Sequence, residues 1–392
     1  MNSTMPLPST LNEPANIAAF LRDTRQLRAE AEWAGIEPDA CDLIVQAAQD
    51  LLQRPERLAD LVRCATALFT PDAWKAEEWS DIPRDNSAGE RFFLLLPLLQ
   101  HLPQMRALYT RHNIPEKILR DTLTDFQIWI DTSRQRTGTT GFREVGWMRE
   151  HLFCRVIRLG RLQFQPYTFH MPFVVLKHLQ RGEIRVAACG GHQITSAGIF
   201  ADSEGAREPF IELTYVEEDG EIRRAHVVEP GGYIATQPTT FAPGEWERIL
   251  SAGDPILNLH IPTGAPLDFD ACRDSFVQAA GFYPRHFPEL PAARGVICGS
   301  WLFNPGLSDI LPENSNIVRF QRAFIRVPQP GATAGQTYER AFVPHGRATR
   351  REQLSTSLQR RLFDHIEAGH VPLSAGGIFP APIGEWGTRV IS

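Results

Sequence analysis

The front of the chain repeats apolar residues with the period of an α-helix. Between Asn16 and Ala34 they recur every three or four positions, and Gly35 follows as a helix stop. The same period returns in four later stretches, which proline opens or bends: residues 38–52, 55–68, 91–111 and 115–130. The pattern predicts that residues 1–150 are entirely helical.

After residue 150 the apolar positions alternate and β-branched residues increase, which favours strands. The strands expected first are residues 156–164, 173–179, 184–188, 210–216 and 221–228. The sequence Glu218-Asp219-Gly220 between the last two is typical of a tight hairpin turn.

From residue 255 onward, strand and helix patterns take turns. We expect strands at residues 255–261, 295–303, 316–325 and about Ile378. Helices are expected at residues 269–282, 304–311 and 353–367. The fold class predicted for the chain is α+β, with an all-helical front followed by a mixed β-sheet flanked by helices.

Glycine usage supports a boundary between the helical part of the chain and the part that contains strands. Only five of the 29 glycines lie in residues 1–150, and glycine is unfavourable inside helices but useful in turns. A chain of 392 residues is also longer than one ordinary core organises. We therefore expect a helical domain over residues 1–150 and a second domain over residues 151–392.

Charge and composition exclude several classes of protein. Forty basic against 46 acidic residues give a net charge of −6, which argues against a nucleic-acid partner. The longest apolar run, residues 92–102, is shorter than the roughly 20 residues of a membrane span. Residues 1–6 show no secretory signal, and the six cysteines form no C-x-x-C pair. We expect a cytoplasmic protein with free thiols and no membrane partner.

Several motifs, in one order along the chain, resemble a known family. The matching stretches are residues 121–126 with Trp129, 147–152, 157–165, 257–262, 298–302 and 311–321. Together they resemble the two-domain bacterial acyltransferase-like proteins, which pair a helical N-terminal domain with a GNAT-like C-terminal domain. The resemblance covers the chain from about Ile114 onward. Because it runs across residue 150, we expect the last helices and the first strand to form one continuous joint.

The resemblance implies transfer of an acyl group from a thioester to a small acceptor. The donor would be acyl-coenzyme A (acyl-CoA) or an acyl carrier protein, and the acceptor an amine. Two features depart from the pattern. The usual pyrophosphate loop, [QR]-x-x-G-x-[GA], is absent, and Gly299 stands where the family commonly has the histidine of Cys-His-Ser-Trp.

The end of the predicted strand at His260 is the strongest candidate for chemistry. Pro262 cannot donate to a β-ladder, so neighbouring strands should splay there and free backbone amides for an oxyanion. The imidazole of His260 suits proton transfer near neutral pH, which makes it the candidate general base. A hydrogen-bonded structural histidine is the competing interpretation.

Donor binding is expected next to that strand end. Ile261, Thr263 and Gly264 lead into a helix that Asp268 can cap, and a helix N-terminus attracts a pyrophosphate. A carboxylate facing the ligand would oppose this. Alternation within residues 316–325 places Arg319 and Gln321 on a common strand face, where they could hold a phosphate or carboxylate.

Two residues of the following strand complete the candidate site. Ser300 could protonate the leaving thiolate, although a serine bonded to the backbone is the ordinary alternative. Cys298 shares the strand face of Ser300 and could pair with His260 as a nucleophile. A buried free cysteine is more often inert.

Two other functions stay open from the sequence alone. One is a GNAT-like module that binds acyl-CoA or another ligand without turnover, suggested by Gly299 and the missing loop. The other is a metal-dependent β-barrel enzyme of the cupin type, suggested by histidines scattered through the predicted strands. Such barrels need an H-x-H pair, which the sequence lacks, so no metal is expected.

Overall fold

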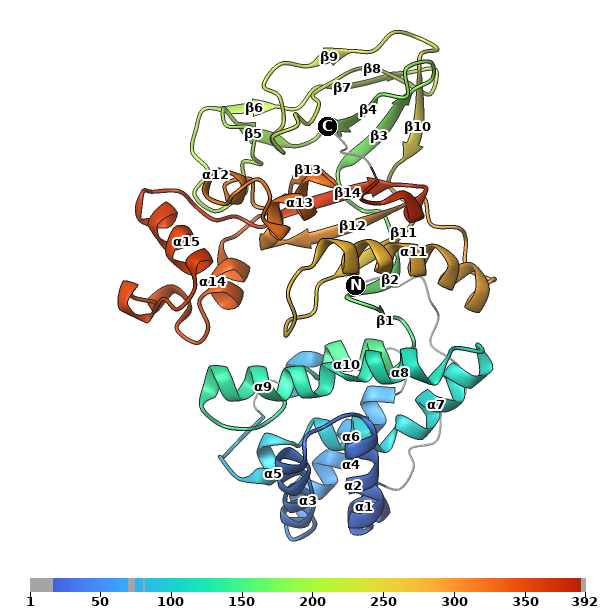
Figure 1. The fold of residues 1–392 in the computed structure, drawn as a ribbon, viewed down its shortest axis with the longest axis vertical. Coiled ribbons are helices and arrows are strands. Elements are labelled where there is room, and N and C mark those ends of the chain that lie inside the picture. Colours follow the sequence, from blue (N-terminus) through green and yellow to red (C-terminus); the bar gives the residue numbers. More distant parts are fainter. Residues whose placement is uncertain (1–16, 70–74, 80–81, 389–392) are drawn as a thin grey trace. The chain divides into compact units, whose positions relative to one another are not determined.

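The computed structural model describes residues 17–69, 75–79 and 82–388. The chain forms two compact units (Figure 1). The helical unit is Met5–Gln165 together with the short segment Ile261–Ala265, and the sheet unit is Pro166–His260 with Pro266–Ser392. The opening residues, on which the expectation about a secretory signal rests, lie outside the described part.

Helices build most of the helical unit. They are α1 (Ile17–Arg22), α2 (Thr24–Trp33), α3 (Pro38–Leu52), α4 (Pro55–Phe69), the 3-10 helix η1 (Ala76–Trp79), α5 (Ala88–Arg91), α6 (Leu95–Gln100), α7 (Leu102–Arg111), α8 (Glu116–Leu123), α9 (Asp125–Thr137) and α10 (Val145–Leu152). The helical front that the sequence predicts is therefore confirmed. The single helix expected from Asn16 is two, because the Asp23 carboxylate accepts a hydrogen bond from the Gln26 amide and starts α2 afresh.

A hairpin completes the helical unit. Strand β1 (Ile157–Leu159) pairs antiparallel with β2 (Leu162–Thr168) around Gly160, whose φ is +68°. The backbone N–H of Arg158 in β1 donates to the hydroxyl of Thr122 in α8 at 3.0 Å. Helix and first strand thus form the continuous joint that the sequence predicts.

One six-stranded mixed sheet organises the chain beyond the helices. Its order is β1-β2-β11-β12-β14-β13, where β11 is Pro255–His260, β12 is Gly295–Ser300, β13 is Ile325–Pro328 and β14 is Ala375–Pro380. Strands β11 and β12 run parallel, while β14 is antiparallel to both β12 and β13. Helix α11 (Phe269–His286) makes the crossover from β11 to β12.

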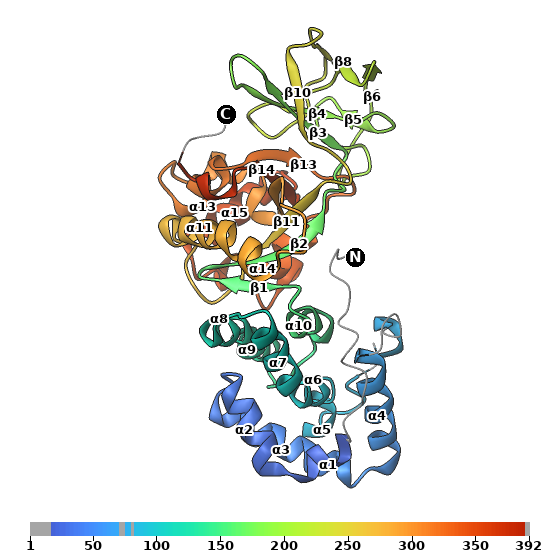
Figure 2. The same cartoon turned by 90° about the vertical axis from the view of Figure 1, so that its right-hand side faces the viewer.

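Helices and aromatic side chains cover one face of this sheet. In Figure 2, α11 lies along it. Phe276 of α11 packs within 6.1 Å of Phe379 of β14 and stacks on Trp386 at 4.5 Å. The other helices of this unit are η2 (Trp301–Phe303), α12 (Leu307–Ile310), α13 (Asn316–Arg322), α14 (Gly335–Ala341), η3 (Gly346–Ala348), η4 (Arg351–Gln353), α15 (Ser357–Glu367) and η5 (Ile383–Glu385).

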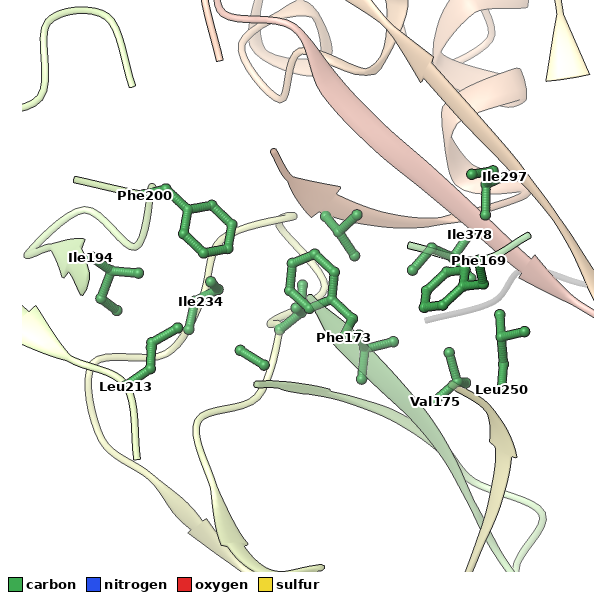
Figure 3. Close-up of a cluster of buried hydrophobic side chains, with 14 of the residues drawn as sticks. Phe169, Phe173, Val175, Ile194, Phe200, Leu213, Ile234, Leu250, Ile297 and Ile378 are labelled. Carbon is green, nitrogen blue, oxygen red and sulfur yellow. The ribbon is translucent and has the colours of Figure 1, made fainter. Parts of the chain in front are cut away.

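The chain segment that connects β2 to β11 forms small antiparallel sheets. Their orders are β10-β3-β4, β5-β6 and β7-β8-β9, with β3 Phe173–His178, β4 Ile184–Ala188, β5 Gln193–Thr195, β6 Phe210–Glu212, β7 Tyr215–Glu218, β8 Glu221–Ala225, β9 Thr239–Thr240 and β10 Trp246–Leu250. Figure 3 shows how their apolar side chains meet the six-stranded sheet: Phe173, Val175 and Leu250 join one buried cluster with Ile297 and Ile378.

One predicted strand is wrong. Residues 316–322 form helix α13, and β13 begins only at Ile325. The hydroxyl of Ser315 accepts a hydrogen bond from the Val318 amide and caps the helix. Apolar residues over so short a stretch fit either period, and here the cap decides in favour of the helix.

Among the helices of residues 17–69, 75–79 and 82–388, none combines the length and the apolar character that a membrane-spanning helix needs.

Candidate active site

The parallel strands β11 and β12 separate before they end. Strand β12 pairs with β14 along its whole length, from Gly295 to Ser300. With β11 it is in register only at Leu257↔Val296 and Asn258↔Ile297. The β-ladder between the two strands therefore stops two residues before His260 and does not reach Gly299, as the splaying expected from Pro262 would require. We call this unpaired stretch between the ends of β11 and β12 the gap.

His260 is the last residue of β11 and is half-buried. Its Nε2 lies 3.4 Å from Nδ2 of Asn258, which is two residues earlier on the same strand face. Because parallel register partners point their side chains the same way, Asn258 and His260 share their face with Ile297 and Gly299 of β12. This face also carries the apolar cluster of Figure 3.

Cys298 and Ser300 lie on the other face of β12. They do share a face with each other, as predicted, but strand alternation turns that face away from the one that carries His260. A Cys298–His260 nucleophilic pair is therefore not supported. Burial raises the pKa of the Cys298 thiol to about 12, so it stays protonated at neutral pH and is a poor nucleophile.

Ser300 serves the backbone. Its hydroxyl oxygen accepts a hydrogen bond from the Leu302 amide at 3.2 Å and caps the short helix η2. The next backbone amide, that of Trp301, donates to Oε1 of Gln336 at 2.6 Å. These contacts fix how the chain leaves the end of β12, and they match the ordinary alternative for a serine at this position.

The residues predicted to bind the donor belong to different units of the structure. Ile261, Thr263 and Gly264 are counted with the helical unit, where Gly264 has a φ of +91° and open space around it. Asp268 caps α11 as predicted, because its carboxylate accepts a hydrogen bond from the Ala271 amide at 2.8 Å. That carboxylate therefore occupies one of the amides that a pyrophosphate would use.

Arg319 and Gln321 do not form the predicted strand pair. On helix α13, residues two apart point in different directions. Arg319 is exposed and places its guanidinium 4.3 Å from the ring of Phe269. The Gln321 amide is fully buried and donates to the carbonyl oxygens of Leu302 and Asn304. Gln321 is thus occupied with holding the chain after β12.

A buried polar cluster in the helical unit escapes the sequence analysis. The carboxylate of Asp125 accepts hydrogen bonds from the Trp147 indole at 2.8 Å and the Gln163 amide at 2.9 Å, and it lies 3.2 Å from Nε2 of His151. Burial by itself would raise the pKa of Asp125, but the hydrogen bonds, led by that of His151, outweigh it and lower the pKa. Asp125, Trp147, His151 and Gln163 all lie in the motifs noted in the sequence, but the sequence does not show that their side chains meet.

Two of the histidines that suggest a metal centre, His178 and His226, hold the backbone. Nδ1 of His178 accepts hydrogen bonds from the backbone amides of Gln180 and Arg181, and Nδ1 of His226 accepts one from Thr214. Within the described ranges no three His, Cys, Asp or Glu side chains come together as a metal site would require. The strands form an open mixed sheet with smaller sheets beside it rather than a cupin barrel.

Two family models give the class of protein to which this mixed sheet belongs. This is a GNAT-like acyltransferase. Residues 156–379 match the family model of the GNAT-like C-terminal domain, and residues 25–154 match that of the N-acyltransferase N-terminal domain. The chain therefore belongs to the family that joins these two domains.

Solved structures of acyltransferases share the fold. One, a mutant in complex with octanoyl-CoA, is 22% identical with a TM-score of 0.63, over 91% of this chain and 88% of that one. Another, with decanoyl-CoA and teicoplanin, is also 22% identical with a TM-score of 0.61 over the same shares. A third, with decanoyl-CoA, is 19% identical with a TM-score of 0.54, over 90% of this chain and 99% of that one. No protein of curated function matches the sequence.

Proposed function

We propose that the protein transfers an acyl group from acyl-CoA directly to a primary amine, with His260 as the general base. The observation that carries the proposal is the gap between β11 and β12, which His260 borders from one side. A base at the rim of such a gap can reach an amine that attacks a thioester held within it.

The reaction needs few groups. The nitrogen lone pair of the neutral amine attacks the thioester carbonyl carbon, and backbone amides beside the gap stabilise the oxyanion of the tetrahedral intermediate. His260 takes one proton from the amine nitrogen. When the intermediate collapses, the carbon–sulfur bond breaks and the thiolate of coenzyme A leaves, to be protonated from His260 or water. The products are an amide and free coenzyme A.

The structural neighbours suggest which donors and acceptors to test first. They were solved with octanoyl-CoA, decanoyl-CoA and teicoplanin. We infer that this chain takes acyl-CoA of similar length, and that its acceptor is a small molecule with a free amine. An acyl carrier protein is the alternative donor, which the same assay can compare.

Thiol release measures the proposed reaction. Octanoyl-CoA and decanoyl-CoA are supplied with teicoplanin and a panel of small primary amines. We expect His260→Ala to lower kcat by about 10²–10⁴-fold, the range for loss of a general base. His345→Ala, which changes an exposed histidine directly before η3, is the matched control. An unimpaired His260→Ala variant would remove His260 from the chemistry.

Two further outcomes separate the alternatives. Mass spectrometry of the protein with octanoyl-CoA and no acceptor should find no acylated Cys298, because direct transfer forms no acyl-enzyme. Coenzyme A binding without thiol release across the whole panel would instead favour a ligand-binding module without turnover.

A further inference from the structure

Two glycines face each other across neighbouring strands at the candidate site. Gly299 of β12 pairs with Gly376 of β14. Alternation from Ile297 and Ile378, which belong to the buried cluster of Figure 3, places both glycines on the sheet face that carries His260. At these two opposed positions neither strand places a side chain of its own on that face.

Two long side chains from other segments cover these positions. A Cβ on Gly299 would sit 2.7 Å from Nε2 of Gln329, and a Cβ on Gly376 would sit 2.8 Å from Cε of Met171. Neither glycine has the left-handed φ that other residues avoid. The backbone therefore does not require glycine here. What glycine provides at these positions is space for Met171 and Gln329.

The amide of Gln329 is available for a ligand. Gln329 follows β13, is half-buried, and makes no hydrogen bond within the described residues. Gln321, eight residues earlier, has its amide fully bonded to backbone carbonyls and a hydroxyl. Gly299 is exposed, so molecules from solvent can reach the place where the Gln329 amide lies.

The strand register relates this amide to His260. Two residues beyond the last register partners, Asn258 and Ile297, stand His260 on β11 and Gly299 on β12. The Gln329 amide and the imidazole therefore lie on one face of the sheet, beside the same gap. Nε2 of Gln329 is 2.7 Å and Oε1 is 3.8 Å from the position that a Cβ on Gly299 would take, so the whole amide lies over that glycine.

We propose that Gln329, laid over Gly299, is a positioning residue for the acyl acceptor, and this rests on the proposed function. A neutral primary amine has two N–H groups. The Gln329 carbonyl oxygen accepts a hydrogen bond from one, while His260 removes the proton of the other as the carbon–nitrogen bond forms. Holding one N–H fixes the direction of the nitrogen lone pair toward the thioester carbon.

Two different substitutions should have the same effect. Gln329→Ala removes the amide, and Gly299→Ala displaces it, since the new Cβ would meet only the end of a flexible side chain. At saturating octanoyl-CoA, we expect each variant to raise the acceptor KM about tenfold, as loss of one hydrogen bond does. The KM for octanoyl-CoA and the slow thiol release without acceptor should change less than about twofold.

The variants also test whether both substitutions change the acceptor KM through the same group, the Gln329 amide. The double variant should be no worse than either single variant, because both remove the same contact. Gln329→Glu keeps an accepting oxygen and should retain an acceptor KM near that of the wild type. Gln193→Ala, on an exposed residue of β5, is the matched control and should leave the acceptor KM unchanged.

The outcomes distinguish this inference from the proposed function. If the wild type releases thiol with an amine but Gln329→Ala keeps its acceptor KM, the inference is overturned and the function stands. Additive effects in the double variant, or failure of Gln329→Glu to restore the acceptor KM, also overturn it. If the wild type releases no thiol with any amine, the proposed function fails. In that case, calorimetry measures the binding of teicoplanin to the coenzyme A-loaded wild type and Gln329→Ala variant. A lower affinity in the variant supports acceptor positioning by Gln329. An unchanged affinity, or no binding to the wild type, overturns it.

Discussion

His151 lies between two hydrogen-bond acceptors. Its Nδ1 is 3.0 Å from the carbonyl oxygen of Trp147, and its Nε2 is 3.2 Å from the Asp125 carboxylate. Its Nε2 is also 3.3 Å from the amide nitrogen of Gln163, so His151, Gln163 and Asp125 form one polar cluster. The side chains of His151 and Asp125 are at most 3% exposed. A buried carboxylate that accepts several hydrogen bonds is sensitive to replacement, because the buried donors around it then lose their acceptor.

We therefore expect Asp125→Asn to lower the free energy of unfolding by about 3 kcal/mol at pH 7, as loss of hydrogen bonds to a buried charged group does. The asparagine amide keeps only one accepting oxygen and turns N–H groups toward the donors of Trp147 and Gln163. Urea denaturation measures this. Asp121→Asn, in an exposed pair with Lys117, is the control and should cost less than about 1 kcal/mol.

The difference in the free energy of unfolding between wild type and Asp125→Asn should depend on pH in a definite direction. The folded-state pKa of Asp125 lies below its ordinary value of 3.8, so the stabilisation is fully present above that value. It is lost as the pH falls through the lower pKa of the folded state. The difference between wild type and Asp125→Asn should shrink in that window, and a difference that grows there would contradict the assignment.

At the scale of elements, local signals predict a segment well wherever a cap or turn is written into the sequence. The hairpin between β7 and β8 turns through Asp219 and Gly220, whose φ values are +51° and +77°, as the sequence Glu-Asp-Gly predicts. Helix α13 shows the limit. Its apolar residues also fit a strand, and only the Ser315 cap and the surrounding packing select the helix.

A pair of glycine substitutions tests how far local conformation determines stability. One glycine lies in a turn with a left-handed φ, and the other lies inside a helix. Gly220→Ala should lower the free energy of unfolding by about 1 kcal/mol, because alanine is strained at a left-handed φ. Gly281→Ala, on the exposed side of α11 with open space around it, should raise it by about 0.5–1 kcal/mol, since alanine favours helix. Thermal or urea denaturation measures both, and effects of the same sign would contradict the argument.

At the scale of the whole molecule, the main segment of the helical unit ends inside strand β2. Strand β1 and the first part of β2 are counted with the helices, and the unit closes at Gln165. Buried side chains of this hairpin include Ile157, Leu162 and Phe164. A division of the chain placed between the last helix and the first strand therefore separates residues that pack together.

Two fragments test where the helical unit ends. A fragment of residues 1–165 keeps the hydrogen bonds from Arg158 to Thr122 and from Gln163 to Asp125, whereas one of residues 1–155 loses both, together with the apolar hairpin. We expect the longer fragment to be more stable by at least about 2 kcal/mol in urea denaturation. Equal unfolding midpoints would show that the hairpin contributes nothing to the helices.

The sequence by itself determined the helical front, the α+β order of elements, the family and the splayed end at His260. The family rests on the resemblance of its motifs, and the other features depend on period, caps, glycine usage and proline, which act over a few residues. Only the tertiary structure decided that Cys298 and Ser300 face away from the side that carries His260, that Gln321 is occupied by backbone carbonyls, and that Gln329 lies over Gly299. Those facts depend on strand register and on contacts between segments far apart along the chain, and no local pattern encodes either.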